Sequence, residues 1–437
     1  MKKKIFALVM CVVAISTTAM CEVRKPAAIK PGDELRLSLA EARDYALQNN
    51  RTLINADIEV RKAHAARWQT IAQMLPQVDG KLDYQSMLGY EMDFGSIKVP
   101  LNPSGTLSVT ASIAVNGQMI VGALLNNVAI DMQNINYRQS ELDIVSSVEQ
   151  YYITALAMEK TVALLDSSLS NLDELHRITL QSVEAGAAEQ TAADQIQVQV
   201  ASMRSAINST RRSMEMIYNA LALQLAAGSE VKLVLTDKLD DVLNVEAALA
   251  LLKEHFNVTR NYSYQLAEQN LDLAKKNVVM AGMAYVPTLS AYYQYSAKTY
   301  FGKEAMMNMT PPNAIGVSLS VPIWSSGKRA AAITEKKLDV QSAQNSLADA
   351  RDGLLVQHKQ LCYDLSSAYE DFDIQKFNID VSQRVFNSTS NKFEQGYASS
   401  LELTNASTTL LTAQSDYVQS ILTLVQAQIA LKKLICK

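Results

Sequence analysis

The chain has 437 residues, of which 48% are hydrophobic and 19% are charged, and its formal net charge is −4. This composition excludes a disordered chain, and the interspersed acidic and basic residues exclude a nucleic-acid-binding protein, which would need a clustered basic face. The low numbers of glycines and prolines, 15 and 9, are expected if long helices dominate the chain.

The N-terminus has the pattern of an export signal. Three lysines follow Met1, an apolar segment runs from residue 5 to residue 15, and small residues come after it. The apolar segment is too short to span a bilayer, so it predicts a cleaved signal peptide over residues 1–21. Lipidation of Cys21 is the alternative interpretation, which Met20 disfavours because a small residue is required there.

After the N-terminal segment, the spacing of apolar residues is first typical of helices and then of strands. A short linker leads to a short helix over residues 39–47 and to a second helix that ends at Pro76, as helices usually do before proline. Residues 78–90 and 106–116 then alternate between apolar and polar side chains. Such alternation is typical of a membrane strand with one side facing lipid and one facing water, although a half-buried strand of a soluble sheet is the alternative.

A long helical hairpin is predicted over residues 120–227, with its turn at Gly186. Residues 229–243 form an irregular connector, and helical spacing resumes from Val245 to Ala284.

The second half of the chain repeats the first. Its strands are predicted at residues 288–299 and 314–323, and its hairpin at residues 326–435 has heptad spacing typical of coiled coils. Pro76 matches Pro287 and Gly186 matches Gly396, with offsets of 211 and 210 residues. These matches predict an internal duplication of residues 22–243 and 244–437, and they weaken the soluble-sheet alternative.

Four strands are too few to close a membrane barrel, and an open edge within lipid would leave backbone groups unsatisfied. Several protomers must therefore share one barrel. The aromatic girdles of such barrels fit residues near the strand ends, namely Tyr90, Tyr295, Tyr300 and Trp324. The hairpins lack long apolar runs, so they should extend into an aqueous compartment rather than cross the membrane.

Two segments carry a family resemblance, Val317–Arg329 at the passage from the last strand into the helix and Gly396–Ala406 at the second hairpin tip. Together with the duplication, they resemble the TolC-like outer-membrane efflux proteins over about residues 35–435. The resemblance implies a mainly α-helical fold with a β-barrel part, formed by a homotrimer in the outer membrane of a Gram-negative bacterium, with a periplasmic helical tunnel.

The same resemblance implies a function and partners. The chain would be the passive exit duct of a tripartite efflux or type I secretion system, and it would be neither an enzyme nor a cofactor-binding protein. Its expected partners are a periplasmic adaptor protein, an inner-membrane pump of RND or ABC type, and the lipid of the outer membrane.

The resemblance also places candidate site residues. The hairpin tips contain Gly186 and Gly396, and the strand-to-helix passage contains Pro322, Trp324 and Gly327. In this family, acidic residues after the second tip ring the periplasmic entrance. Glu402 and Asn405 occupy those positions, so one of the two charges is missing, and Asp194 near the first tip is out of register.

Two interpretations of Glu402 remain open. Repeated by trimer symmetry, it would form a negative ring that favours cations at the entrance. Alternatively, it is a solvated glutamate that interacts with the dipole at the start of its helix.

Two other functions compete with the duct. A secreted coiled-coil scaffold would explain the heptads but not the paired alternating strands. An exported enzyme would explain neither, and the sequence has no catalytic motif. The four histidines, at positions 64, 176, 255 and 358, lack metal-ligand spacing, and His176 is predicted to be a packed residue in the heptad core.

Overall fold

The computed structural model describes residues 34–88, 90–93, 95, 98–100, 102–186, 188–228, 231–243, 245–301 and 311–436. The predicted signal peptide and Cys21 lie outside these residues. The chain forms two compact units. Unit 1 contains the described residues of Met1–Ile58, Tyr137–Asn261 and Leu354–Lys437, and unit 2 contains those of Glu59–Asn136 and Tyr262–Gly353. Each unit therefore draws on both predicted sequence repeats.

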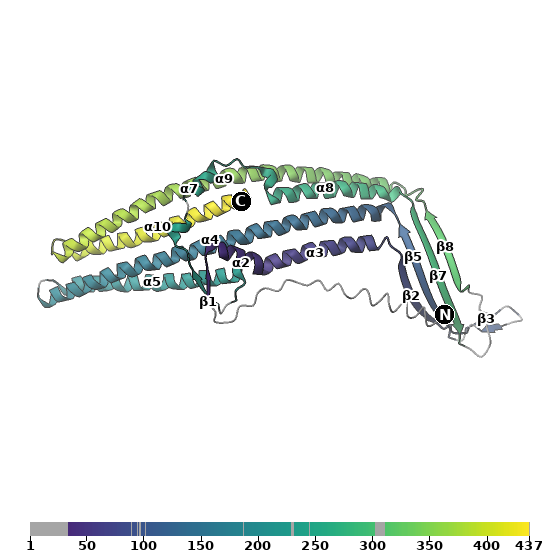
Figure 1. Ribbon diagram of the computed structural model, residues 1–437, viewed down its shortest axis with the longest axis horizontal. Helices are drawn as coiled ribbons and strands as arrows, with labels where there is room; N and C mark the ends of the chain where they lie inside the picture. The colour runs from purple at the N-terminus through teal and green to yellow at the C-terminus, as the bar shows by residue number, and fades with distance from the viewer. Residues whose placement is uncertain are drawn as a thin grey trace. The chain divides into compact units, whose positions relative to one another are not determined.

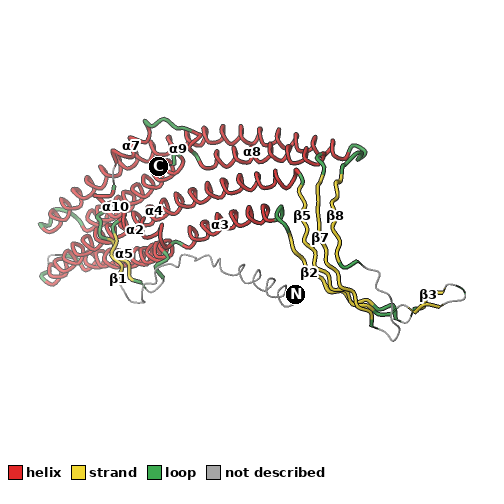
Figure 2. Tube along the Cα trace, turned by 45° about the vertical axis from the view of Figure 1, so that its right-hand side comes forward, coloured by secondary structure: helices red, strands yellow, loops and turns green. Residues whose placement is uncertain are grey.

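Unit 2 is built on a four-stranded antiparallel sheet with the order β2-β5-β7-β8 (Figures 1 and 2). The strands are β2 (Gln77–Gln85), β5 (Ser104–Val115), β7 (Thr288–Tyr300) and β8 (Asn313–Ser320). The first strand ends earlier than the predicted residue 90. A small hairpin of β3 (Glu91–Asp93) and β4 (Lys98–Pro100), which the sequence did not predict, lies between β2 and β5.

Helices begin or end directly at this sheet. Asn116 follows β5 and accepts a hydrogen bond from the Met119 amide at 2.8 Å, which caps α4 (Gly117–Glu184). A Cβ atom at Gly117 would come within 2.7 Å of Met283 Sδ, so a larger residue there would force the Met283 side chain to move. Met283 belongs to the short 3₁₀ helix η2 (Met283–Tyr285), which follows α8 (Tyr262–Gly282) and leads to β7.

Unit 1 contains the turns and the larger part of two long helical hairpins, whose first helices begin within the residues of unit 2. Helix α4 turns back into α5 (Gln190–Leu225), and α9 (Lys328–Glu394) turns back into α10 (Ser400–Leu434) (Figure 1). The core of unit 1 consists of side chains from both hairpins, including Tyr152 and Leu156 of α4 and Leu424 of α10. The predicted heptad positions of α9 contribute Leu354, Leu365, Ala368, Phe372 and Phe386 as buried residues. They come from both heptad phases, as expected where a four-residue slip joins two heptad runs.

The predicted irregular connector is partly ordered. β6 (Lys232–Leu235) pairs in parallel with β1 (Glu34–Leu37), and α6 (Leu239–Val242) follows it. β1 lies in the segment that we predicted to be a linker before α2 (Leu39–Asn49) and α3 (Arg51–Ala72). Both strands are only four residues long, and their pairing joins distant parts of the chain.

The helical spacing from Val245 to Ala284 corresponds to two α-helices with a break between them. The structure has α7 (Val245–Leu252), a 3₁₀ turn η1 (Val258–Arg260) and then α8. Asn257 interrupts the helix because its side chain caps η1 by accepting a hydrogen bond from the Thr259 amide at 3.1 Å. The buried Asn261 amide then donates to the Leu434 carbonyl at 2.9 Å, which ties this turn to the end of α10.

Candidate functional site

The sheet of unit 2 has one apolar and one polar face. Directly paired residues of an antiparallel sheet point to the same side, so the pairings Leu82↔Leu107, Tyr293↔Ile315 and Leu289↔Leu319 define an apolar face. Its large side chains are exposed, with Ile315 at 82%, Val317 at 73% and Leu82 at 78%. A contiguous exposed apolar face of this kind marks a surface that contacts lipid or another protein.

The opposite face of the sheet is polar. Its paired rows include Lys81↔Ser108, Ser108↔Ser296 and Ser290↔Ser318. Charged residues also lie on this face, and Lys81 forms an ion pair with Asp83 at 2.9 Å. Hydroxyl and charged groups are suited to a water-filled space, so the sheet has the properties of a wall between lipid and water.

The sheet is open at both edges. Within the described residues, β2 pairs only with β5, and β8 pairs only with β7. An edge strand presents a row of unpaired backbone groups that can accept another strand. The sheet can therefore be extended on both sides by copies of itself.

The passage from β8 into α9 makes a sharp turn. Ser326 and Gly327 both have positive φ values, 48° and 80°, a conformation that glycine adopts readily. The Arg329 guanidinium donates to the Pro322 carbonyl at 2.9 Å and lies 5.2 Å from the centre of the Tyr285 ring. These contacts fix the passage, while the side chain of Trp324 is 83% exposed.

Both hairpin turns depend on glycine. Gly186 and Gly396 have φ values of 71° and 75°, and neither would have a contact within 4 Å at an added Cβ, so the requirement is one of backbone conformation. At the second tip, the Gly396 amide donates to Phe393 at 3.0 Å and the Tyr397 amide donates to Lys392 at 2.7 Å. This pair of hydrogen bonds is the Schellman motif that ends many helices.

The structure places Glu402 at the start of α10 in a capping box. Its carboxylate accepts hydrogen bonds from the Ser399 amide at 2.8 Å and from the Ser399 hydroxyl at 3.2 Å, while the Glu402 amide donates back to Ser399 Oγ at 3.2 Å. Glu402 is therefore a helix-capping residue. Glu402 and Asn405 are both exposed, and Asp194 of α5 accepts a hydrogen bond from Gln190 at 2.9 Å.

A groove of about 470 Å³, called the tip groove here, lies between α5 and α10. Its lining consists of Thr191, Asp194, Gln195, Val198, Gln199, Leu401 and Thr404. Ser400 donates to Gln195 at 2.8 Å and joins the two helices beside it. Val198 and Leu401 are 62% and 61% exposed, so the groove has apolar contact points at its surface.

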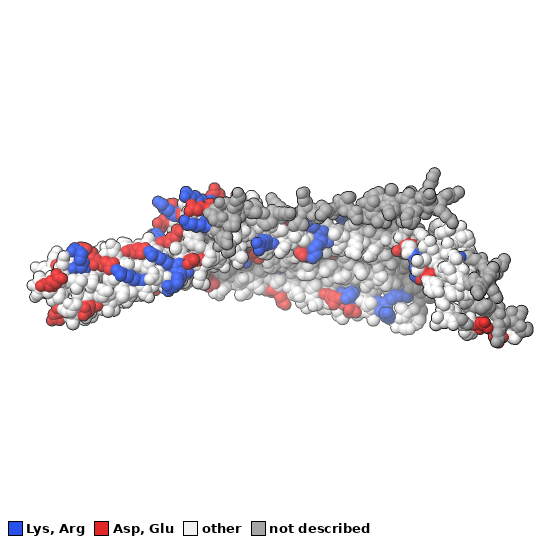
Figure 3. Space-filling model, turned by 90° about the horizontal axis from the view of Figure 1, so that it is seen from below, with Lys and Arg blue, Asp and Glu red and all other residues white. Residues whose placement is uncertain are grey.

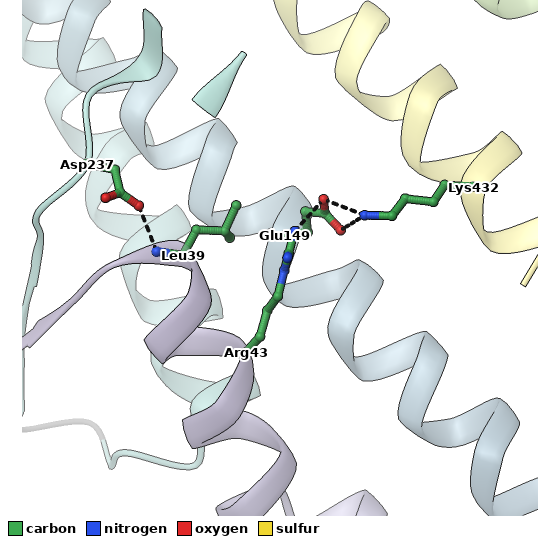
Figure 4. A network of polar contacts seen from close by, with 5 residues as sticks. All are labelled: Leu39, Arg43, Glu149, Asp237 and Lys432. Carbon is green, nitrogen blue, oxygen red and sulfur yellow. Dashed lines mark hydrogen bonds and ion pairs between the residues drawn. The ribbon is translucent and has the colours of Figure 1, made fainter. Parts of the chain in front are cut away.

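A partly buried ionic network that the sequence did not reveal joins three helices of unit 1 (Figure 4). The carboxylate of Glu149 on α4 accepts hydrogen bonds from Arg43 of α2 at 2.6 Å and from Lys432 of α10 at 3.0 and 3.2 Å. Its side chain is only 12% exposed. The three residues are 106 and 283 positions apart, so sequence spacing gave no signal for the contact.

A second polar cluster lies nearby in the same unit. Asp237 accepts hydrogen bonds from the Leu39 amide at 2.7 Å and from the buried Tyr152 hydroxyl at 3.1 Å, and Tyr152 also lies 3.0 Å from the Leu37 carbonyl. Burial raises the pKa of Tyr152 to about 12. The cluster fixes β1 and the start of α2 on α4.

Helix α9 has two opposite apolar faces within unit 1. Leu354, Leu365 and Phe372 bury one face, whereas a second set of side chains forms an exposed stripe on the other side of the helix. This α9 stripe consists of Val356 (68% exposed), Tyr363 (72%), Ile374 (57%), Phe377 (66%) and Val385 (48%). Helix α5 has a comparable α5 stripe of Val198, Met216 and Leu223 opposite its own buried residues.

The described residues of the helices offer no metal centre, and the face drawn in Figure 3 has no separation of acidic from basic side chains. In the described residues, no group of three or more His, Cys, Asp or Glu side chains could hold a metal ion. His176 is half-buried rather than packed in the core, and His358 stacks on Phe256 with ring centres 4.7 Å apart. On the face drawn in Figure 3, acidic and basic side chains alternate along the hairpin of unit 1.

In the part of the chain that the structure describes, every helix is too short or too polar to cross a membrane.

Comparison with known proteins places these features in a family. The family model described as outer membrane efflux protein matches residues 42–228 and 259–436. No curated protein matches the chain in sequence. Among solved structures, the chain is similar to the transmembrane channel CusC, with a TM-score of 0.74 and 16% identity over 95% of this chain and 97% of CusC.

Two further channels have the same fold. The chain is similar to the CmeC outer membrane channel of Campylobacter jejuni, with a TM-score of 0.71 and 15% identity over 91% of this chain and 85% of that one. It is also similar to the open state of the MtrE outer membrane channel of Neisseria gonorrhoeae, with a TM-score of 0.72 and 16% identity over 94% of each chain.

Proposed function

The chain belongs to the outer membrane efflux protein family, and we propose that it forms the passive exit duct of a tripartite efflux or type I secretion system. One observation carries the proposal, namely the open sheet with an exposed apolar face and a hydroxyl-rich face. In a chain of this family, lipid on the apolar side and water on the hydroxyl-rich side fit such a sheet best. A soluble scaffold would need another protein to cover the apolar face.

The duct requires several copies of the chain, and we propose a homotrimer. The two open sheet edges supply the strand pairing, and the α9 and α5 stripes supply the helix packing. The α9 stripe of one copy would pack on Met216 and Leu223 in the α5 stripe of the next copy, whereas Val198 at the tip end of that stripe lines the tip groove. Because these stripes lie on different helices, the contact is heterologous, and the proposed trimer requires the rotation between neighbouring copies to close into a ring.

The partners that we propose are a periplasmic adaptor protein and an inner-membrane pump of RND or ABC type. The tip groove is the proposed adaptor surface because Val198 and Leu401 are exposed there beside hydrogen-bonding groups of Gln195 and Thr191. The exposed Tyr397 at the adjacent turn adds an aromatic contact of the kind enriched at protein interfaces.

The site residues have corresponding proposed roles. Gly186 and Gly396 shape the periplasmic tips, while Pro322, Trp324 and Gly327 form the strand-to-helix passage. Glu402 caps α10 and, repeated in the trimer, also gives the entrance a negative ring, to which Asn405 and Asp194 add polar groups. We also propose that residues 22–243 and 244–437 arose by duplication, with a signal peptide at residues 1–21.

The test combines assembly with conductance. We expect the detergent-extracted protein to have the mass of a trimer by light scattering with the detergent subtracted, and to form ion-conducting channels in planar bilayers. A soluble monomer without conductance would contradict the proposal.

A matched pair of variants tests the interface. Phe377→Glu puts a charge in the α9 stripe and should shift the mass from trimer to monomer, because an unpaired charge in an apolar interface is unfavourable. Asn387→Glu puts the same charge on an exposed position of α9 outside the stripe and should leave the trimer intact. Equal effects of the two substitutions would rule out the stripe as the interface.

A further inference from the structure

The polar face of the sheet carries a tyrosine ring near its helical end. Tyr292 of β7 pairs with Ser112 of β5 on one side and with Gly316 of β8 on the other, so it belongs to the hydroxyl-rich rows. The next residue, Tyr293, pairs with Ile315 and points to the apolar face. In the proposed duct, Tyr292 therefore faces the water-filled lumen, and the inference about it rests on that proposed function.

The phenol of Tyr292 lies across Gly316. A Cβ atom at Gly316 would come within 2.5 Å of Cε1, 2.7 Å of Cζ and 2.9 Å of the hydroxyl oxygen of Tyr292. Gly316 is accordingly the one residue of β8 that is not exposed. The phenol thus rests against the wall of the sheet at a position where only a glycine leaves room for it.

The neighbours of this phenol on the polar face are small. Ser112 flanks it in its own row, and the row on the helical side consists of Ala114, Ser290 and Ser318. These side chains are too short to cover an aromatic ring, and Tyr292 remains 43% exposed. Part of the ring is therefore open to a solute that moves along the polar face.

The charge closest in register to the ring is negative. Among the residues of the four strands, Asp79 is this closest charged residue, since it pairs with Thr110 in the row next to that of Tyr292. Asp79 is exposed. The first lysine, Lys81, lies one row further away and is engaged in its ion pair with Asp83. The surroundings of the ring therefore favour a positively charged solute.

The open edges of the sheet bring a second carboxylate to the same place. β8 and β2 are the two edge strands, so β2 of the next copy adjoins β8 in the proposed trimer. Asp79 of that copy then lies on the Gly316 side of the ring. Each seam between copies thus combines an aromatic ring from one copy with an acidic strand from the next.

We propose that Tyr292, together with Asp79, forms a contact in the lumen for aromatic organic cations that pass through the duct. The face of an aromatic ring attracts cations, and a planar aromatic cation can also stack on it. Three copies supply three such contacts at one level of the barrel. Each contact is weak, so it favours the entry of this class of cargo without preventing its release.

Tyr300 provides a comparison within the same face. It pairs with Ser104 at the opposite end of the sheet, so it lies on the polar face and not on the lipid side expected from the sequence. The Lys298 ammonium lies 4.9 Å from the centre of the Tyr300 ring. A cation of the chain itself already occupies this ring, so we expect Tyr300 to contribute nothing to the binding of an organic cation.

The test is channel recording of the full-length protein in planar bilayers with N-methylquinolinium, a planar aromatic cation. The measured quantity is the concentration that halves the channel current. Tyr292→Leu should raise this concentration about 2–5-fold, as expected for the loss of an exposed cation–π contact. Tyr292→Phe keeps the ring and should behave as the wild type, and the matched control Tyr300→Leu should also leave the concentration unchanged.

A second probe tests the chemical class of the ligand. Naphthalene-2-sulfonate has the same ring size and the opposite charge, so it should block less, and Tyr292→Leu should not change its effect. Asp79→Asn should weaken the block by N-methylquinolinium only. Equal effects of Tyr292→Leu on both probes would overturn the assignment to cations.

The remaining outcomes separate this contact from the duct itself. A wild-type protein that conducts no ions would refute the duct and the contact together. Normal conductance with the same half-blocking concentration in the wild type and in Tyr292→Leu would refute the contact alone. If Tyr292→Leu lowers the midpoint of thermal unfolding but leaves the block unchanged, the phenol only covers Gly316, and the contact is likewise refuted.

Discussion

Replacing Glu149 with glutamine tests how strongly the buried carboxylate holds unit 1 together. The substitution keeps the size of the side chain but removes the negative charge between Arg43 and Lys432, whose side chains are each only 31% exposed. Two partly buried cations would then face each other without their common partner. A charge-assisted hydrogen bond contributes about 1.5–3 kcal/mol, and breaking a buried ion pair costs about 3–5 kcal/mol.

Because both cations keep some contact with water, we expect a loss at the lower end, about 3 kcal/mol. The matched control is Asp240→Asn. Asp240 binds Lys160 at 2.6 Å, the same distance as Arg43 to Glu149, but its side chain is 75% exposed. An exposed ion pair contributes only about 0–1 kcal/mol.

The assay is thermal unfolding of the purified proteins in detergent, followed by far-UV circular dichroism at one fixed scan rate. The midpoint should fall by several degrees for Glu149→Gln and by much less for Asp240→Asn. In the double variant Glu149→Gln with Lys432→Gln, part of the loss should be recovered, because one of the unpaired cations is gone. Equal shifts for the two single variants would refute the reasoning from burial.

Three further predictions concern other groups of unit 1. Tyr152→Phe removes the hydroxyl that lies between the Leu37 carbonyl and the Asp237 carboxylate, so it should cost about 1–3 kcal/mol in the same assay. An unchanged midpoint would contradict this role. Burial, with the nearby charge of His255, lowers the pKa of His358, so folding disfavours the protonation of this residue. The stability of the protein should therefore fall as the pH drops below about 6.5. His358→Phe should make this fall of stability with pH less steep, whereas the exposed control His64→Phe should leave it unchanged. Glu402→Gln keeps the capping box but removes the charge, so it should reduce cation preference in bilayer recordings without lowering the unfolding midpoint. Glu402→Ala should reduce cation preference and also lower the midpoint, because loss of the cap costs about 0.5–2 kcal/mol of stability. An unchanged reversal potential for both variants would eliminate the negative ring.

The elements whose side-chain pattern repeats over many residues could be predicted from the sequence. The alternation around Leu107 and Ile315 indicates which residues of a strand share its apolar face, and heptad spacing on α9 identified Leu365 and Phe372 as core residues. Those patterns repeat over many residues, so a single exception does not hide them. The glycines at the two tips were equally visible, because few other residues tolerate positive φ.

Short or distant contacts could not be predicted in this way. β1 and β6 have four residues each, too few to show a period, and Glu34 pairs with Lys232 far along the chain. The break after α7 had a local signal that we missed, since Asn257 is a helix-capping residue type. The capping box of Glu402 was also available, because Ser399 stands three residues before it.

The network around Glu149 has a consequence for the order in which the protein is built. Arg43 comes from the beginning of the chain, Glu149 from its first hairpin and Lys432 from its last turn of helix. Contacts with such a large sequence separation form slowly, because long loops must close before they contribute stability. A chain that emerges N-terminus first therefore holds a buried acid and its first cation in an incomplete site until the final residues arrive. Unit 1 should mature only after translocation has ended, and until then it is a natural substrate for periplasmic chaperones and proteases.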